Sequence, residues 1–301
     1  MVRLAAAVAS GRHPYILAHE FFDALLIHAF EATPAGWREL LVSPSPPLSP
    51  KKPDFVLSCA DAPTRHSLLL LELSPRYRAL AATPGAVIEI SPDALVLAEE
   101  IAHRIGMPHA GAALVVDYGP STTVPANSLR GIRAHSRVSP LVNVGAISVS
   151  ADVNFHALAK RVLAASPHVE VHGPVVQGPF LLTMGMCERL DQLTSTAATG
   201  STVRAAEEAG LGSRRMRRWL KSGFQRLVDT EPGAMGAVYK VLHRARARWQ
   251  EARRLWRRRL RIGLSIYYTS NYSYRPACVS QRRKRGSEGA TKSSSLYSRP
   301  R

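Results

Sequence analysis

The sequence predicts an α/β protein in which apolar strands and helices alternate. Two apolar runs, Tyr15–Ala18 and Ala112–Val116, each end in polar residues. An uninterrupted apolar run of this length is typical of a strand that is buried on both faces of a sheet. Residues 91–106, between the two runs, have the periodicity of an amphipathic helix. Because ligands of open parallel sheets bind beyond the carboxyl ends of the strands, the polar residues after each run are candidates for a functional site.

The helix at residues 91–106 carries signals at both ends. Ser91 is a plausible N-cap, Pro92 suits the first helical position, and Asp93 complements the helix dipole. Gly106 ends the pattern. The spacing predicts a buried stripe of four residues, namely Leu95, Ala98, Ala102 and Ile105.

Several other segments have recognisable local patterns. Residues 27–42 contain two alternating runs around a Thr-Pro-Ala-Gly turn, which predicts a β-hairpin. Residues 43–55 are rich in Pro and Ser and predict a surface loop. Further strands are predicted at residues 85–90, 128–135 and 171–185, and a further helix at residues 151–165.

The positive charge of the chain is concentrated at its C-terminal end. The formal net charge is +18, and residues 243–301 hold 17 Lys and Arg against 2 acids, which leaves only +3 for residues 1–242. Such a tail can bind nucleic acid or anionic membrane nonspecifically. We expect residues 243–301 to form a basic tail without a fixed place in the fold, because like charges repel and the end of the chain is rich in Ser, Lys and Arg.

Composition excludes several classes of protein. The hydrophobic content of 46% suffices for a sizeable core, and no apolar run reaches the roughly 18 residues of a membrane span. Three isolated cysteines without CxxC spacing argue against a disulfide framework or a structural zinc site and suit a reducing compartment. The histidines show no metal-ligand spacing, so we expect no metal site; they include His28, His103, His109, His135 and His172. No GxSxG motif supports a serine nucleophile.

Six segments resemble one family. They are "LAHEFFDALLIHAFEATPAGWRELLV", "GAALVVDYG", "LRGIRAHSRVSPL", "ADVNFHAL", "GPVVQGPFLLTMGM" and "RLVDTEPGAMGAVYKVL". Together they resemble the MidA-like family of S-adenosylmethionine-dependent methyltransferases, over roughly Tyr15 to Leu242. The resemblance implies a partial class I (Rossmann-like) methyltransferase fold with added β-hairpins and helices. It also implies S-adenosylmethionine as cofactor and type II methylation of an arginine on a respiratory complex I subunit, during assembly of that complex in the mitochondrial matrix.

The same resemblance implies roles for the polar residues after the two apolar runs. Glu20 and Asp23 would be catalytic, and His19, Asp117 and Tyr118 would bind the cofactor. Carboxylates suit a guanidinium substrate, because Arg donates paired hydrogen bonds to them. Alternatively, the acids after the first run cap a following helix or pair with local bases. If both strands belong to one parallel sheet, Glu20, Asp23 and Asp117 should come together at one edge of it.

The sequence also departs from the family pattern. The family has a Gly-rich loop after a first strand and an acid after a second strand that binds the ribose, and neither pattern occurs in these 301 residues. Four further positions differ. The family has Pro where this chain has Leu26 and Val144, and it has Asp where this chain has Ser148 and Asn154. We therefore expect residues 1–242 to correspond to the C-terminal part of such a domain, in a truncated or mis-spliced chain that is weakly active or inactive. An uncovered sheet edge would favour association into a homo-oligomer.

Two further functions stay open from the sequence. A chain with half a cofactor pocket could be a non-catalytic assembly scaffold. Residues 202–227 resemble two short helices around a Gly-containing turn, the general form of a helix-turn-helix that binds nucleic acid. Four arginines open the second helix, namely Arg214, Arg215, Arg217 and Arg218. The simpler interpretation of this segment is an exposed basic helix on a methyltransferase-like body, and we expect no specific nucleic-acid partner.

Overall fold

The computed structural model describes six stretches of the chain, and every structural statement below concerns these residues. They are residues 14–45, 55–81, 83–106, 111–134, 136–195 and 213–246. Most of the predicted surface loop, the first half of the helix-turn-helix candidate, His109, His135 and residues 247–301 of the predicted tail lie outside them.

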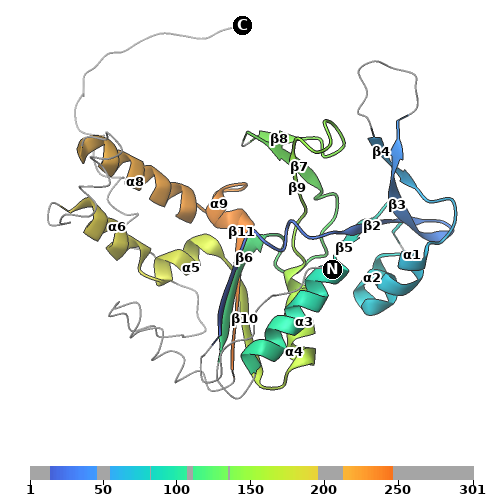
Figure 1. The fold of residues 1–301 in the computed structure, drawn as a ribbon, viewed down its shortest axis with the longest axis horizontal. Helices are drawn as coiled ribbons and strands as arrows, with labels where there is room; N and C mark the ends of the chain where they lie inside the picture. Colours follow the sequence, from blue (N-terminus) through green and yellow to red (C-terminus); the bar gives the residue numbers. More distant parts are fainter. Residues whose placement is uncertain are drawn as a thin grey trace, which may run out of the picture.

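The main sheet is mixed and has four strands in the order β1-β6-β11-β10 (Figure 1). Their bounds are β1 Tyr15–His19, β6 Ala112–Tyr118, β11 Tyr239–Arg246 and β10 Val169–Val176. Strands β1 and β6 run parallel, with Tyr15 opposite Ala112, whereas β11 is antiparallel to both of its neighbours. The α/β class and the two strands predicted from apolar runs are therefore confirmed.

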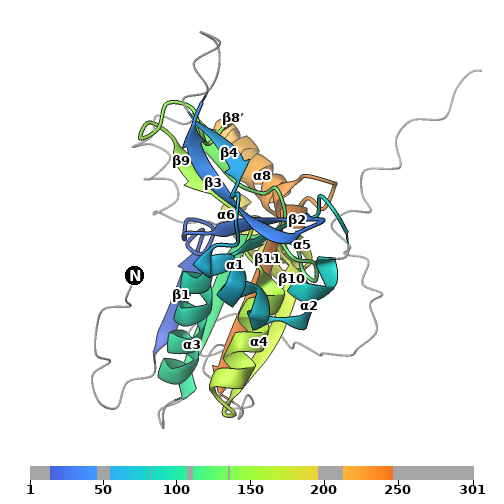
Figure 2. The same cartoon turned by 90° about the vertical axis from the view of Figure 1, so that its right-hand side faces the viewer.

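Helices cover both faces of the main sheet, as Figures 1 and 2 show. On one face lie α3 (Pro92–Gly106) and α4 (Phe155–Ala165), and on the other lie α5 (Gln177–Thr183) and α9 (Met235–Val238). Helices α6 (Met186–Thr194) and α8 (Ser213–Val228) pack beyond α5. None of the described helices combines the length and the apolar character that a membrane crossing requires.

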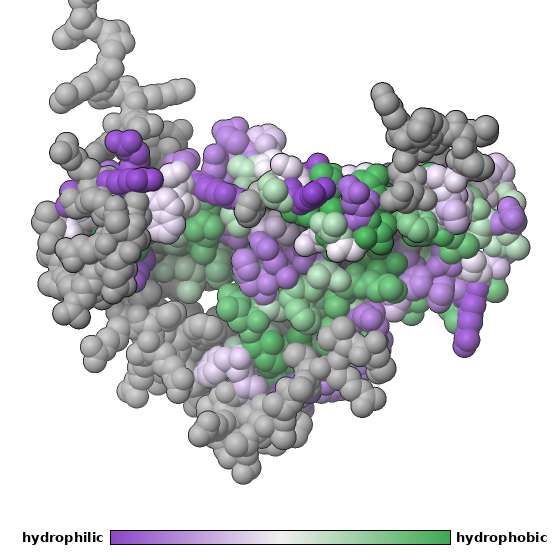
Figure 3. All heavy atoms as spheres, turned by 45° about the horizontal axis from the view of Figure 1, so that its top comes forward, coloured by the Kyte–Doolittle hydropathy of each residue, from purple (hydrophilic) through white to green (hydrophobic). Residues whose placement is uncertain are grey.

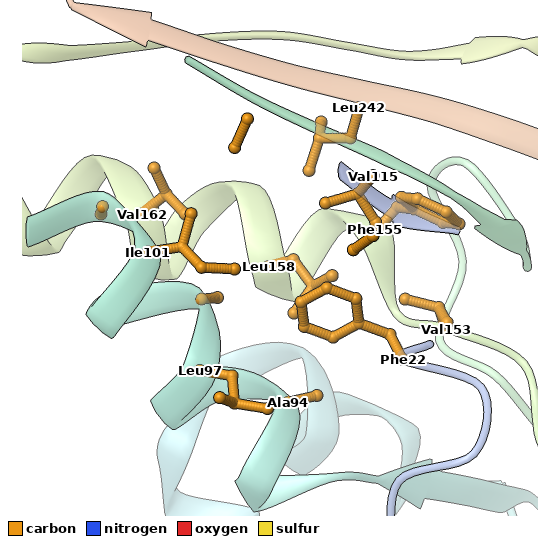
Figure 4. Close-up of a cluster of buried hydrophobic side chains, with 14 of the residues drawn as sticks. Phe22, Ala94, Leu97, Ile101, Val115, Val153, Phe155, Leu158, Val162 and Leu242 are labelled. Carbon is orange, nitrogen blue, oxygen red and sulfur yellow. The ribbon is translucent and has the colours of Figure 1, made fainter. Parts of the chain in front are cut away.

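The largest hydrophobic core lies between the main sheet and the α3–α4 pair (Figure 4). Figure 4 shows Val115 and Leu242 of the sheet above Leu158 and Val162 of α4, with side chains of α3 beside them. The predicted helix is confirmed as α3, but its buried stripe is wrong in one position. Its buried residues are Ala94, Leu97, Ala98, Ile101, Ala102 and Ile105, whereas Leu95 is half-buried.

Polar side chains start both helices of this pair. The backbone N–H of Ala94 donates to Ser91 Oγ at 3.3 Å, as the predicted N-cap requires. The predicted helix at residues 151–165 is confirmed as α4, where the N–H of Ala157 donates to Asn154 Oδ1 at 3.0 Å. Asn154, which departs from the family's Asp, thus still provides a cap.

Two antiparallel sheets accompany the main sheet. The first has the order β4-β3-β2-β5, and the pairing of β2 with β3 confirms the predicted hairpin. It encloses a second core that includes Phe30, Ile88 and Tyr77. The bounds are β2 His28–Thr33, β3 Gly36–Pro44, β4 Phe55–Cys59, β5 Val87–Ile90, α1 Arg65–Leu69, η1 Leu70–Leu73 and α2 Pro75–Leu80. The other sheet consists of β8 (Ser136–Val138), β7 (Arg130–Arg133) and β9 (Ser148–Ser150).

The strand predicted at residues 128–135 is confirmed as β7, which belongs to the small sheet. Two other predictions differ from the structure. The strand predicted at residues 171–185 ends at Val176, and Gln177–Thr183 form helix α5, whose first turn accommodates a proline because the first N–H groups of a helix need no partner within it. The predicted boundary at residue 242 falls within β11, since this strand continues to Arg246.

A glycine after β6 allows two chain segments to approach closely. Gly119 has φ +150°, and a Cβ there would overlap the carbonyl oxygen of Val153 and lie 2.9 Å from its backbone nitrogen. The N–H of Val153 donates to the carbonyl oxygen of Tyr118 at 2.8 Å, so the contact holds the chain that leads into α4 against the end of β6.

We predict that Gly119→Ala lowers the free energy of unfolding by about 2–4 kcal/mol, because the methyl group forces these segments apart. Urea denaturation measures the change. Gly223→Ala is the matched control: this glycine lies in α8 with no atom within 4 Å of the added Cβ, so the change should be neutral or stabilising by up to ~1 kcal/mol. Equal stabilities of the two variants would contradict the predicted close approach.

Candidate functional site

The candidate site lies where the parallel strands β1 and β6 end side by side. His19 pairs with Val116 in the last register position of β1, and the N–H of Glu20 donates to the carbonyl oxygen of Val116 at 3.0 Å. The chain therefore leaves β1 directly beside Asp117, the next residue of β6. This position follows from the parallel pairing, which places the carboxyl ends of both strands at one end of the sheet.

Asp117 holds the loop that follows β1. Its side chain is fully buried, and Oδ2 accepts hydrogen bonds from the backbone N–H groups of Phe21, Phe22 and Asp23 at 3.1, 2.9 and 3.3 Å. Oδ1 accepts from the N–H of Tyr118 at 2.9 Å. Because the carboxylate is occupied by four backbone groups, the geometry supports a positioning role for Asp117.

Burial disfavours the charged form of this carboxyl group. Desolvation, followed by the nearby charge of Asp23, raises the pKa of Asp117 from 3.8 to about 7. Hydrogen bonds from the backbone of Tyr118, Phe21 and Phe22 act in the opposite direction. The stability of the loop is therefore coupled to pH in the neutral range.

Glu20 is held by two tyrosines in an unusual backbone conformation. Its φ is +47°, in the left-handed region that residues with a side chain rarely occupy. Tyr118 Oη donates to Glu20 Oε1 at 3.1 Å, and Tyr239 Oη of β11 contacts both of these oxygens. Burial is the main cause that raises the pKa of both tyrosines, so their hydroxyls stay protonated and able to donate at neutral pH. The carboxylate of the exposed Glu20 is thereby oriented.

Asp23 is the second acid of this loop, and it lies near a cation. It is 8% exposed, and burial, followed by the charge of Glu20, raises its pKa, while Arg130 lowers it. Arg130 Nη1 lies 2.6 Å from Asp152 Oδ1, and its guanidinium carbon lies 5.0 Å from the centre of the Tyr118 ring. The guanidinium of Arg130, which Asp152 holds in place, thus lies beside the group of acids.

His19 lies at the rim of the site. Its side chain is exposed, and its ring stacks on that of Tyr239 with 6.2 Å between the ring centres. The predicted proximity of Glu20, Asp23 and Asp117 is confirmed, with Tyr118 among them. The roles that the resemblance assigns to these residues stay predictions.

Sequence reasoning did not identify three residues of the site, namely Tyr239, Arg130 and Asp152. Tyr239 stands in the family-like segment "MGAVYKVL", and it reaches the site because β11 places it opposite Tyr118. Arg130 begins β7, which pairs with β9 next to Asp152. A local motif signals none of these contacts, because they all depend on strand pairing across long stretches of sequence.

The site combines several acids with hydrogen-bond donors, a set of groups that favours a cationic ligand. The acidic side chains of Glu20, Asp23 and Asp117 lie close together, and two tyrosine hydroxyls orient the exposed one. Clustered carboxylates attract cations electrostatically, and a carboxylate pairs in two-point fashion with guanidinium.

The second helix of the helix-turn-helix candidate is α8. Its Trp219 is 66% exposed, and Arg215, Arg217 and Arg218 are exposed as well. Figure 3 shows hydrophilic residues on the left, the side on which α8 lies in Figure 1, and also over the centre and right of the same face. Helix α8 packs against α5, α6 and α9. Its described contacts are therefore those of a surface helix that belongs to the same domain as the main sheet.

Comparison with known proteins identifies a family and several relatives. Residues 3–175 match the family described as "Putative S-adenosyl-L-methionine-dependent methyltransferase". The mitochondrial protein arginine methyltransferase NDUFAF7 of Rattus norvegicus is 36% identical over 63% of this chain and 39% of its own length. The same-named protein of Homo sapiens is 36% identical over 60% and 37%, and that of Bos taurus is 34% identical over 76% and 45%.

Solved structures are similar at the level of the fold. The crystal structure of an uncharacterized protein from Burkholderia thailandensis superposes with a TM-score of 0.58 at 20% identity. The match covers 81% of this chain and 58% of that protein's chain. A structure from the same organism that contains S-adenosyl-homocysteine gives 0.55 at 19% identity, with 81% and 56% covered. This chain therefore spans less than half the length of the arginine methyltransferases described above and somewhat more than half of each solved structure.

The buried carboxyl of Asp117 predicts a pH-dependent stability difference. A folded-state pKa raised to about 7 gives stability that is fully present below the unfolded value of 3.8 and is lost as pH rises through about 7. We therefore predict that wild type loses stability relative to Asp117→Asn, by up to about 4 kcal/mol, between about pH 4 and pH 8. Urea denaturation across this range measures the difference. Asp191→Asn, which changes an exposed residue of α6, is the control. Parallel curves of unfolding free energy against pH for wild type and Asp117→Asn would contradict the prediction.

Proposed function

We infer the function of this chain from its family: it belongs to the S-adenosyl-L-methionine-dependent methyltransferase family that matches residues 3–175. We propose that the site transfers a methyl group from S-adenosylmethionine to a protein arginine, because the relatives described above are named protein arginine methyltransferases. Since the chain spans well under two thirds of the length of these relatives, the activity of the whole protein is part of this proposal.

The observation that carries the proposal is the group of acids at the ends of β1 and β6. Glu20 is exposed and oriented by Tyr118 and Tyr239, so its free oxygen can accept from an incoming guanidinium. Asp23 is the second acid, close enough to Glu20 for the charge of Glu20 to add to burial in raising its pKa. A guanidinium nitrogen is a weak nucleophile, and fixed carboxylates help it by holding the nitrogen in line and by stabilising its charge.

The remaining residues of the site would position these two acids. Asp117 fixes the backbone of the loop that carries Asp23, and Arg130 limits the repulsion between the acids. The left-handed backbone of Glu20 costs of order 1–3 kcal/mol, and such strain occurs where a side chain must point in a set direction. In this proposal Glu20 and Asp23 are catalytic, and Asp117 is a positioning residue instead of a direct cofactor ligand.

The described residues fit the cofactor in part. His19 and Tyr118 border the group of acids, where they could contact a bound cofactor, which would supply a methyl group on a positively charged sulfur. Clustered carboxylates suit that charge. We propose that these residues form one side of the cofactor pocket, at the carboxyl ends of β1 and β6.

We propose a mitochondrial location, since the relatives are named mitochondrial. The resemblance to the MidA-like family extends the proposal to the matrix, to type II methylation, and to a subunit of respiratory complex I as the protein substrate. We also propose a homo-oligomer that associates along β1, because this strand is at the edge of the main sheet and exposes the apolar side chains of Tyr15 and Leu17.

We predict that this polypeptide, expressed alone, binds S-adenosylmethionine weakly and does not methylate arginine. The family pattern holds the cofactor through a Gly-rich loop and a ribose-binding acid, which we do not identify in this sequence. The loss of two hydrogen bonds to charged groups, at about 1.5–3 kcal/mol each, weakens binding by on the order of a hundredfold or more. Calorimetric titration of folded protein measures the affinity, and a dissociation constant in the low micromolar range would contradict the prediction.

A chimera tests the proposed function directly. The 230 residues that align with the Bos taurus relative would replace the matching region of that protein, so that the rest of it completes the pocket. We expect the chimera to bind S-adenosyl-homocysteine and to methylate an arginine peptide. Glu20→Gln should lower kcat by on the order of a hundredfold, because the amide cannot hold the guanidinium by charge.

The controls separate catalysis from scaffolding. Glu72→Gln changes an exposed glutamate of η1 that pairs with Arg78 and should leave kcat unaltered. Cofactor binding without methylation would favour the scaffold function. Unchanged kcat in both Glu20→Gln and Asp23→Asn would overturn the roles proposed for the acids.

A further inference from the structure

A second group of polar side chains lies on the antiparallel sheet β4-β3-β2-β5 and the adjoining helix α1, and it shares no residue with the acids described above. His28 begins β2, Glu39 lies in β3, and His66 lies in α1. His28 Nδ1 is 2.7 Å from Glu39 Oε1, and His66 Nδ1 is 3.1 Å from the same oxygen and 3.3 Å from Oε2. The two imidazole rings have their centres 4.0 Å apart, so both converge on one carboxylate.

We propose that His28, Glu39 and His66 form a binding site for a divalent transition metal ion, with Zn²⁺ as the best fit. One ligand atom from each residue lies within 4.8 Å of the other two. Zn²⁺ binds imidazole nitrogen and carboxylate oxygen at about 2.0–2.1 Å, so tetrahedral ligand atoms are about 3.3 Å apart. The two separations from Glu39 Oε1, 2.7 and 3.1 Å, would open by about 0.6 and 0.2 Å on metal binding, and the ligand atoms of the two histidines lie within 4.8 Å of each other.

The charge balance around Glu39 favours a cation. This carboxyl is 4% exposed, and its described side-chain partners, the two histidines and the hydroxyl of Thr64, satisfy it by hydrogen bonds. None of these partners is permanently charged, and the adjacent Arg38 donates instead to the carbonyl oxygens of Ala35 and Trp37. A dication bound by the three ligands would add a fixed positive charge beside this carboxylate.

The ligand set suits Zn²⁺, which binds carboxylate oxygen and the unprotonated nitrogen of an imidazole. In the metal-free site the Nδ1 atoms of both histidines lie at hydrogen-bond distance from Glu39. Metal binding would replace the protons of these hydrogen bonds, and each imidazole would keep its proton on Nε2.

One coordination position would be open to solvent or to a further ligand. The side chain of His66 is 51% exposed, whereas those of Glu39 and His28 are 6% and 16% exposed, so the site opens on the α1 side. Three protein ligands with one free position are a common arrangement for Zn²⁺. Because the ligands come from β2, β3 and α1, the ion would tie this helix to the sheet.

Metal titration of the full chain tests the proposal. After removal of bound metal with a chelator, Zn²⁺ should bind with micromolar or tighter affinity at one equivalent and raise Tm. Co²⁺ should give the visible absorption of a low-symmetry site without a thiolate band. His66→Ala should weaken Zn²⁺ binding by at least ~100-fold.

The control is His103→Ala, which removes an exposed histidine of α3 whose Nε2 lies 3.6 Å from a carboxylate oxygen of Glu99, as part of an ordinary ion pair. It should leave Zn²⁺ affinity unaltered. Glu39→Gln tests the buried ligand, and His66→Ala remains decisive if that variant does not fold. Absence of one-equivalent Zn²⁺ binding, equal affinity in wild type and His66→Ala, or binding of Mg²⁺ in preference to Zn²⁺ would each overturn the proposal.

Discussion

The arrangement of the candidate site depends on one buried carboxyl group. Asp117 is the last residue but one of β6, and its oxygens accept backbone hydrogen bonds from the three residues Phe21 to Asp23 and from Tyr118. These bonds join two segments that are almost one hundred residues apart and satisfy the N–H groups of a loop that would otherwise be unpaired. Since the loop carries Glu20 and Asp23, the direction of both acids follows from this contact. The cost of burying the carboxyl appears as its raised pKa.

The antiparallel strand β11 completes the arrangement from the other side. Its pairing with β6 places Tyr239 opposite Tyr118, and both hydroxyls reach Glu20. The same strand contributes Leu242 to the core beneath α3 and α4. Any shift in the register of β11 would therefore change the packing of the core and the orientation of Glu20 together. The geometry of the site therefore depends on the whole mixed sheet, including β11, whereas the two apolar runs in the sequence predicted only β1 and β6.

The sequence predicted those features that have local signals. Helix α3 was marked by its caps, the β2–β3 hairpin by alternation around a turn, and the candidate acids by their place after apolar runs. The strand predicted at residues 171–185 was wrong beyond Val176, because an apolar run with glycine and proline does not distinguish a strand from a short helix. Tyr239 and Arg130 could not be found, since their contacts depend on strand register, and single-sequence patterns carry no information about it.

The two polar clusters show how differently one fold can accommodate buried carboxylates. Around Asp117 the compensation comes from backbone N–H groups, which are fixed donors that leave the neighbouring Glu20 available for a ligand. Around Glu39 it comes from the side chains of His28 and His66, whose nitrogens can exchange a proton for a metal ion. Backbone donors fix a shape, whereas imidazoles can respond to their surroundings. The spacing of the histidines along the chain gave no metal signal, because β2, β3 and α1 bring the three ligands together only in the folded sheet.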